Sequence, residues 1–513
     1  MSEAQSARGV QLGLAGAGLF VAALDAYLVV TLLPAMMTDV GLTIDRFEQA
    51  TPIVTGFLCG YVIAMPLLGA YSDVRGRAPV YALCVVVFAA GSALTATAGS
   101  LPWLVAGRVL QGLGGGGLVP LTLAVAADLY QNRARTFALG AVSGLQEAGS
   151  VFGPIYGATL ASAASALGGW RFVFWLNVPL AAICAAGLLI ASRDSRSQAP
   201  QTSSLTRTFD NRATSLARTF DWKSASLLGL GLGLLVVALY PDDPDHRATS
   251  GLFIPLGILS LLVLALYGWR QVHALEPLIP RQLLRSPRFA GAAAANLLIG
   301  AALIVALVDV PILGRLVFDL DQLAAGLLLT QFLLGVPVGA VLGGFLAGRL
   351  GARLTAVLGT LVAAAAFLQM STWQAGELAL RIGPLRPADI ALGACGLGFG
   401  IVIAPLAATV LELTRAQHHG LASSLVVLAR VMGMLIGLSA LTAFGLFRFR
   451  QILGTPQLTD PDVRARVEHL GRLVAAAFLQ EYREIFTIAA GLCILAAVVV
   501  FVTLRRETSY TAR

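Results

Sequence analysis

Long apolar runs separated by short polar segments dominate the chain. They form a first group at about 11–33, 51–71, 79–99, 102–126, 137–160 and 172–191. An isolated pair follows at about 224–240 and 252–269. A second group lies at about 289–312, 323–346, 355–372, 389–409, 419–445 and 485–503. Because a helix of about 20 apolar residues spans a hydrocarbon core about 30 Å thick, the pattern predicts about fourteen membrane-spanning helices.

These runs divide the chain into four parts. We expect an N-terminal six-helix bundle over 1–191, a cytoplasmic linker over 192–223 and two inserted transmembrane helices over 224–271. A C-terminal six-helix bundle is expected over 272–513, with an extracytoplasmic extension at about 446–482. The linker is rich in Ser, Thr, Arg and Asp, a composition typical of a solvated connection.

Composition and charge agree with a membrane protein. Hydrophobic residues make up 57% of the chain and charged residues only 12%, whereas an average soluble domain is about a quarter charged. The formal net charge of +8 comes from arginines dispersed between the apolar runs, which does not favour nucleic-acid binding. With a cytoplasmic N-terminus, about 21 Lys and Arg fall on the inner side and about 12 on the outer. We therefore expect a multi-pass protein of the inner (plasma) membrane with both termini cytoplasmic.

A short segment is repeated between the two groups of six runs. Gly69–Gly76 aligns with Gly344–Gly351, 275 residues later, and each follows the second run of its group. Parallel halves of this kind are a known plan of transporters. The second copy carries Gly348 where the first carries an aspartate.

The first copy, which extends to Arg77, predicts a conformational latch on the inner face. Its glycines allow helix ends to approach closely, and its aspartate can bind helix N-terminal amides or a basic group. The alternative is a plain tight loop. The residues assigned to the latch are Gly69, Asp73, Arg75, Gly76 and Arg77.

Three charged residues lie deep inside apolar runs. Asp25, Glu147 and Arg430 each stand about 10 to 14 residues into their runs. Each would cost about 2.5–3.5 kcal/mol in a lipid-facing position, so they should face the interior and find partners. We expect the two acids to exchange protons while Arg430 competes for them. The alternative is a static buried ion pair.

Other chemistries find little support. The five cysteines lie within apolar runs without metal-ligand spacing, which indicates neither a disulfide nor a metal site. The glycine run Gly112–Gly117 lacks the residues of a phosphate-binding loop and favours close helix packing. The adjacent His418 and His419 are expected to be solvated. The sequence thus predicts no enzyme and no cofactor, with the proton motive force as the energy source.

Four ordered motifs resemble the major facilitator superfamily. They are the loop Gly69–Arg77, the R-V-L-Q-G of Arg108–Gly112, the G-x-x-x-G-P-x-x-G of Gly149–Gly157 and the W-R-x-x-F-x-x-N-x-P of Trp170–Pro179. The last two are similar to motifs of the fourteen-span drug:proton antiporters. The resemblance implies roles for Arg108, Gln111, Gly112, Gly149, Gly153, Pro154 and Gly157.

Further segments resemble the mycobacterial exporters of triacylglycerides. They are Leu24–Thr31, Gln146–Ser150, Val308–Val310, Ala416–His418 and Ala429–Gly437. This resemblance implies a lipid or lipophilic drug as substrate and a periplasmic lipoprotein as a candidate partner.

The expected fold is therefore an all-α major facilitator arrangement, with two six-helix bundles and two inserted transmembrane helices, acting as a monomer. The expected function is proton-coupled export of lipophilic molecules such as triacylglycerides by alternating access, because a largely apolar cavity suits them. A multidrug:proton antiporter is the alternative, and a non-transporting membrane scaffold or receptor is the third possibility.

Overall fold

The computed structural model describes residues 3–42, 49–197, 220–239, 249–274, 277–320, 322–379, 386–453 and 463–504. Within these residues the secondary structure is helical, as predicted. Most of the linker predicted at 192–223 lies outside the described residues.

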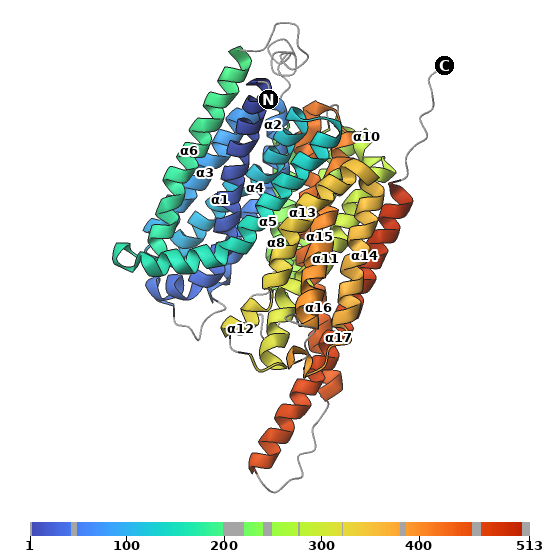
Figure 1. Cartoon of the computed structure of the whole chain (residues 1–513). Helices are drawn as coiled ribbons and strands as arrows, with labels where there is room; N and C mark the ends of the chain where they lie inside the picture. The colour runs from blue at the N-terminus through green and yellow to red at the C-terminus, as the bar shows by residue number, and fades with distance from the viewer. Residues whose placement is uncertain are drawn as a thin grey trace.

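The first six long helices form one bundle, seen on the left of Figure 1. They are α1 (Glu3–Asp39), α2 (Thr51–Arg75), α3 (Arg77–Thr97), α4 (Leu101–Leu129), α5 (Asn132–Ala163) and α6 (Trp170–Ser197). A short 3-10 turn, η2 (Ser165–Leu167), precedes α6. We call this bundle the first half.

Six further long helices form the second half, on the right of Figure 1. They are α11 (Pro287–Leu316), α13 (Thr330–Leu350), α14 (Ala352–Met370), α15 (Pro387–Glu412), α16 (His419–Leu453) and α17 (Val463–Thr503). Short elements join them: α10 (Arg281–Leu284), α12 (Gln322–Leu327), η3 (Glu377–Ala379) and η4 (Ala416–His418). A buried apolar cluster continues through both halves.

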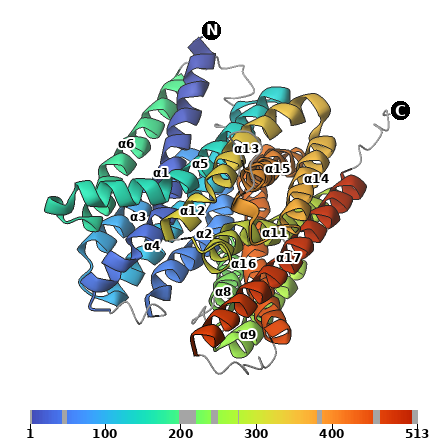
Figure 2. The ribbon, with the colours of Figure 1, turned by 60° about the horizontal axis from the view of Figure 1, so that its bottom comes forward.

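Two inserted helices lie between the halves in sequence, α8 (Trp222–Leu239) and α9 (Phe253–His273). The first packs against α2 and α16, and the Ser439 hydroxyl donates a 2.6 Å hydrogen bond to the Leu239 carbonyl. The second packs on α8 and lies at the edge of the bundle in Figure 2. The predicted order of six, two and six helices is confirmed.

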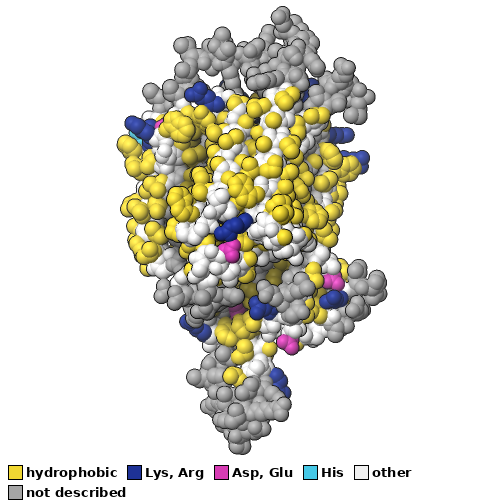
Figure 3. Space-filling view, turned by 90° about the vertical axis from the view of Figure 1, so that its left-hand side faces the viewer, with side chains coloured by type: hydrophobic (Ala, Val, Ile, Leu, Met, Phe, Trp, Pro, Cys, Tyr) yellow, Lys and Arg dark blue, Asp and Glu magenta, His cyan; other side chains and the backbone are white. Residues whose placement is uncertain are grey.

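Thirteen helices of the described chain are long and apolar enough to cross a membrane. The remaining bundle helix is α5, which misses this criterion although it packs against α1 and α13. Its polar residues, among them Ser143, Gln146 and Glu147, lower its hydropathy where it meets other helices. Apolar side chains cover the middle of the face in Figure 3, and charged ones lie mainly above and below. The fold is that of a multi-pass membrane protein.

The two ends of the molecule differ. The beginning of α1 and the end of α17 lie at one end, which we call the termini end (Figure 1). At the opposite end, α17 projects past the bundle, so we call it the extension end. With 41 residues, α17 is about 60 Å long, roughly twice the hydrocarbon thickness. The beginning of α17 lies within the extension predicted at about 446–482.

The glycine run of α4 serves helix packing, as predicted. A Cβ at Gly112 would lie 2.1 Å from the Phe57 carbonyl oxygen, and one at Gly116 would lie 2.2 Å from that of Tyr61. Only glycine allows α2 and α4 to approach this closely.

Candidate functional site

Asp25 lies at the centre of a polar network inside the first half. Its carboxylate is 0% exposed and accepts a 2.7 Å hydrogen bond from Arg108 Nη1. The side-chain amides of Gln111 and Asn177 donate to Asp25 Oδ1 over 3.0 and 2.7 Å. Helices α1, α4 and α6 are therefore joined at this point.

A second layer closes the network. The Ser92 hydroxyl accepts hydrogen bonds from the amides of Gln111 and Asn177, over 2.7 and 3.1 Å. The Arg108 guanidinium lies 4.4 Å from the centre of the Phe57 ring, a cation–π contact. Every one of these partners belongs to the first half, so the network stabilises one bundle internally.

The predicted competition of Arg430 for Asp25 does not appear in this structure. Among the ion pairs between described residues, Asp25 is joined to Arg108, and Arg430 is joined to Glu147. The sequence pointed to Arg108 only as part of the motif Arg108–Gly112. The fold instead puts it beside Asp25.

The second ion pair connects the two halves. Arg430 Nη2 of α16 lies 3.1 Å from Glu147 Oε1 of α5, and the two side chains are 8% and 16% exposed. Arg430 Nη1 is buried and has no hydrogen-bond partner among the described residues. This guanidinium thus keeps N–H groups free for a further acceptor.

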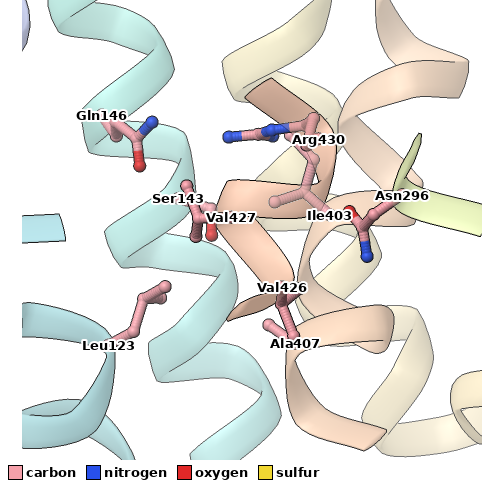
Figure 4. A pocket seen from close by; sticks show the side chains of 9 residues that line it. All are labelled: Leu123, Ser143, Gln146, Asn296, Ile403, Ala407, Val426, Val427 and Arg430. Atoms are coloured by element: carbon pink, nitrogen blue, oxygen red, sulfur yellow. The ribbon is translucent and has the colours of Figure 1, made fainter. Parts of the chain in front are cut away.

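A small cavity adjoins Arg430. Its volume of about 10 Å³ is room for about one water molecule. Figure 4 shows the Arg430 guanidinium reaching from α16 toward Gln146 of α5. The residues that line the cavity are Leu123, Ser143, Gln146, Asn296, Ile403, Ala407, Val426, Val427 and Arg430. Most of this lining is apolar, and both halves contribute to it.

The latch predicted at the end of α2 contacts the second half. Asp73 accepts hydrogen bonds from the backbone amides of Gly420 and Leu421, over 3.0 and 2.9 Å. These amides open α16, so the carboxylate binds a helix N-terminus. Arg77 pairs with Asp73 and donates to the Ala416 carbonyl over 3.1 Å.

The other two latch positions lie beside these contacts. Gly76 has a φ of +97° between α2 and α3, a conformation that favours glycine. Arg75 is exposed.

Two latch residues were not found from the sequence. Asp128, near the end of α4, lies 3.2 Å from Arg77 Nε and 2.7 Å from His419 Nδ1. The His419 side chain is only 4% exposed, so its predicted solvation is wrong. It is buried because the start of α16 docks against α2 and α4. The sequence feature that could have pointed to Asp128 is an aspartate at the end of an apolar run.

At the termini end, glycines allow helices of the two halves to come into close contact at two places. A Cβ at Gly420 would lie 2.3 Å from the Gly69 carbonyl oxygen, where α2 meets α16. A Cβ at Gly140 would lie 2.9 Å from the Gly344 Cα atom, where α5 meets α13. Gly69 and Gly344 are the equivalent positions of the internal repeat. Both copies thus supply a close contact between the halves.

The fifth-span motif packs against α1. A Cβ at Gly149 would lie 2.6 Å from Ala23 Cβ, and one at Gly153 would lie 2.6 Å from the Leu24 carbonyl oxygen. One turn further on, a Cβ at Gly157 would lie 2.9 Å from Leu28 Cβ. The motif holds α5, and with it Glu147, against the helix that carries Asp25.

The proline of this motif makes a polar contact with the same helix. The Pro154 carbonyl accepts a 3.2 Å hydrogen bond from the Thr31 hydroxyl of α1.

Comparison with known proteins agrees with this architecture. The model of a family described as the Major Facilitator Superfamily matches residues 15–438. The chain belongs to the Major Facilitator Superfamily. A triacylglyceride transporter of Mycolicibacterium hassiacum is 38% identical over 98% of this chain and 93% of that protein. One of Mycobacterium tuberculosis is 37% identical over 96% of this chain and 94% of that protein.

Solved structures share the superfamily fold. The human organic anion transporter MFSD10 aligns with a TM-score of 0.62 and 18% identity, over 96% of this chain and 99% of that one. The proton:xylose symporter XylE aligns with a TM-score of 0.62 and 15% identity, over 98% and 96%. The resemblance to the superfamily and to the mycobacterial transporters is confirmed, which indicates a transporter rather than an enzyme.

For this superfamily member, the Asp73→Asn variant is expected to loosen the termini end. Charge-assisted hydrogen bonds contribute about 1.5–3 kcal/mol each, so a population shift of roughly tenfold to a hundredfold toward the open termini end is expected. Spin labels at Arg133 and Gln417, both exposed and in opposite halves, would report it as longer distances. The control is Asp389→Asn, which removes an ion pair within the second half. Identical distance distributions in both variants would disprove the latch.

Proposed function

We propose that this protein exports neutral lipophilic molecules of the triacylglyceride class across the plasma membrane, with both termini in the cytoplasm. Support comes from the names of its relatives, which cover nearly the whole chain. In the observed state the cavity between the halves has room for only about one water molecule, so the substrate site has to form when the halves move apart.

The observation that carries the mechanism is the ion pair between Glu147 and Arg430. It joins α5 to α16, so its formation favours contact between the halves. Protonation of Glu147 removes one of the two charges and breaks the ion pair, which weakens the contact between the halves. Loss of that proton restores the pair. Proton binding therefore changes the contact between the halves, which couples proton transfer to the conformational change.

Asp25 has a different role from Glu147 in the proposed mechanism. It keeps the role of a second proton carrier, which titrates only when its contact with Arg108 opens. Until then the network holds α1, α4 and α6 together as one rigid unit.

Alternating access would require the contacts that close the termini end to break and re-form. In the observed state, the contacts of Asp73 and Gly420 close the termini end, which we take as the cytoplasmic side. Rocking of the halves would break these contacts and open that side. The proton motive force provides the energy: one charge crossing 100 mV supplies about 2.3 kcal/mol. The projecting part of α17 is then extracytoplasmic and available to a lipoprotein that receives the cargo.

A multidrug:proton antiporter is the second candidate. The glycines of the fifth-span motif pack against α1, as that resemblance requires. The two candidates share the coupling mechanism and differ in the substrate.

The test is transport by the full chain reconstituted into vesicles. A 100 mV proton-driven potential should enrich fluorescent triacylglyceride on one side by up to about 50-fold per proton. The Glu147→Gln variant should abolish this enrichment while the lipid still binds. The control Asp39→Asn removes a more exposed ion pair and should transport normally. Gradient-driven movement of drugs without lipids would favour the second candidate, and full transport by Glu147→Gln would overturn the mechanism.

A further inference from the structure

A second group of carboxylates lies in the second half, away from Glu147. Helices α11 and α17 pack against each other, and a Cβ at Gly291 of α11 would lie 1.9 Å from Thr503 Oγ1 of α17. Asp309 and Glu481 are 18 and 22 residues from that contact in the same direction along the two helices, so they lie at a similar level. Asp309 is half-buried. Glu481 is only 6% exposed, and its Oε2 atom is buried without a hydrogen-bond partner in the described part of the chain. The sequence pointed to Asp309 only within the segment Val308–Val310 and did not single out Glu481.

The neighbouring helix is built to fit the Glu481 carboxyl group. A Cβ at Gly445 of α16 would lie 2.3 Å from Glu481 Oε1, so only glycine leaves room there. The buried ring of Tyr482 lies close enough to interact electrostatically with both carboxylates. Three helices, α11, α16 and α17, therefore surround the two acids.

Two arginines of α16 and α17 are engaged with other groups. Arg448 of α16 donates from Nε and Nη2 to the two oxygens of Glu484, over 2.6 and 2.9 Å. Arg483 donates to the Ser371 carbonyl over 2.8 Å. No ion pair between described residues includes Asp309 or Glu481. The other charged neighbour of Glu481 is Glu484, whose carboxylate is paired with Arg448.

The position of the two acids along the membrane normal decides whether protons can reach them from water. From Glu481 to the end of α17 at Thr503, the helix runs about 22 residues, or about 33 Å, close to the hydrocarbon thickness. Arg483 bonds to Ser371, just past the end of α14, which marks the same level. The pair lies at the extension end, near the boundary between hydrocarbon and water.

We propose that Asp309 and Glu481 together bind one proton, as a proton site of the second half distinct from Asp25 and Glu147. Two close carboxylates without a cation cannot both be ionised, and a shared proton lets one donate to the other. Loss of the proton drives α11 and α17 apart through repulsion. Proton occupancy thereby controls how the base of the α17 extension packs on the bundle.

Infrared spectroscopy of the reconstituted full chain tests this site without any transport measurement. The wild type should show a protonated carboxyl band that titrates reversibly. Asp309→Asn and Glu481→Gln should each remove this band, whereas the control Asp389→Asn, which removes an ion pair at the start of α15, should retain it. Glutamine matches the shape of protonated glutamate, so the fold should persist. Gly445→Ala keeps both acids but displaces the Glu481 carboxyl group, and should shift the midpoint of the titration.

Two results would overturn the proposal. One is a titrating band that is unchanged in both Asp309→Asn and Glu481→Gln. The other is loss of the band on addition of Na⁺ at constant pH, which would assign the site to a metal cation. Because neither readout depends on export, the site can fail while the proposed function holds, and the reverse.

Discussion

Replacing Arg108 by leucine is expected to lower the free energy of unfolding by about 3–5 kcal/mol. Asp25 would remain as an uncompensated charge at a position that is 0% exposed. The amides of Gln111 and Asn177 would still donate to it, but they carry no charge. Unfolding by denaturant in lipid bicelles would measure the loss.

Two further variants separate lost charge from lost packing. Adding Asp25→Asn to Arg108→Leu should recover most of the stability, because the buried charge is then gone. Arg171→Leu removes an ion pair whose side chains are 27% and 45% exposed, and should cost less than about 1 kcal/mol. Equal losses in the single and double variants would mean that Arg108 acts through packing alone.

Replacing Gly420 by leucine is expected to prevent closure of the termini end. A Cβ there would lie 2.3 Å from the Gly69 carbonyl oxygen, a backbone atom that cannot move aside at low cost. We expect at least about a hundredfold shift toward the state in which this end is open, which requires about 2.7 kcal/mol. Distances between spin labels at Arg133 and Gln417 would measure it, and transport should fall in parallel.

The matched control is Gly268→Leu. Gly268 lies on α9, and a Cβ there would meet nothing within 4 Å. This variant should leave both the distances and the transport unchanged. Unaltered distances in Gly420→Leu would mean that the contact between α2 and α16 does not keep the termini end closed.

The sequence identified the charged residues of the interior but not their partners. Asp25, Glu147 and Arg430 stand out because each interrupts an apolar run, whereas Arg108 was noted only as part of a motif. Which arginine lies opposite which acid depends on how the helices turn and pack. That information comes from the ion pairs that join α1 to α4 and α5 to α16, helices that are far apart in sequence.

The roles of Asn177, His419 and Glu481 were missed because their burial also depends on helices that are distant in sequence. Asn177 lies in a motif that was recognised, yet its contact with Asp25 could not be inferred from spacing. His419 is polar and follows a predicted loop, so solvation was the natural expectation. Glu481 lies in a segment with many other charges. In each case burial arises only when a helix from elsewhere in the chain covers the residue.

The sequence by itself determined the membrane class, the six-two-six order of helices, the superfamily and the glycine-dependent packing of α4. These follow from local quantities: the length of apolar runs, the cost of charge in lipid and the volume of a side chain. The tertiary structure decided that one ion pair lies within the first half and another between the halves, and that Glu481 is buried against Gly445. Partners of this kind are set by the rotation and docking of distant helices, which depend on the packing of the whole bundle.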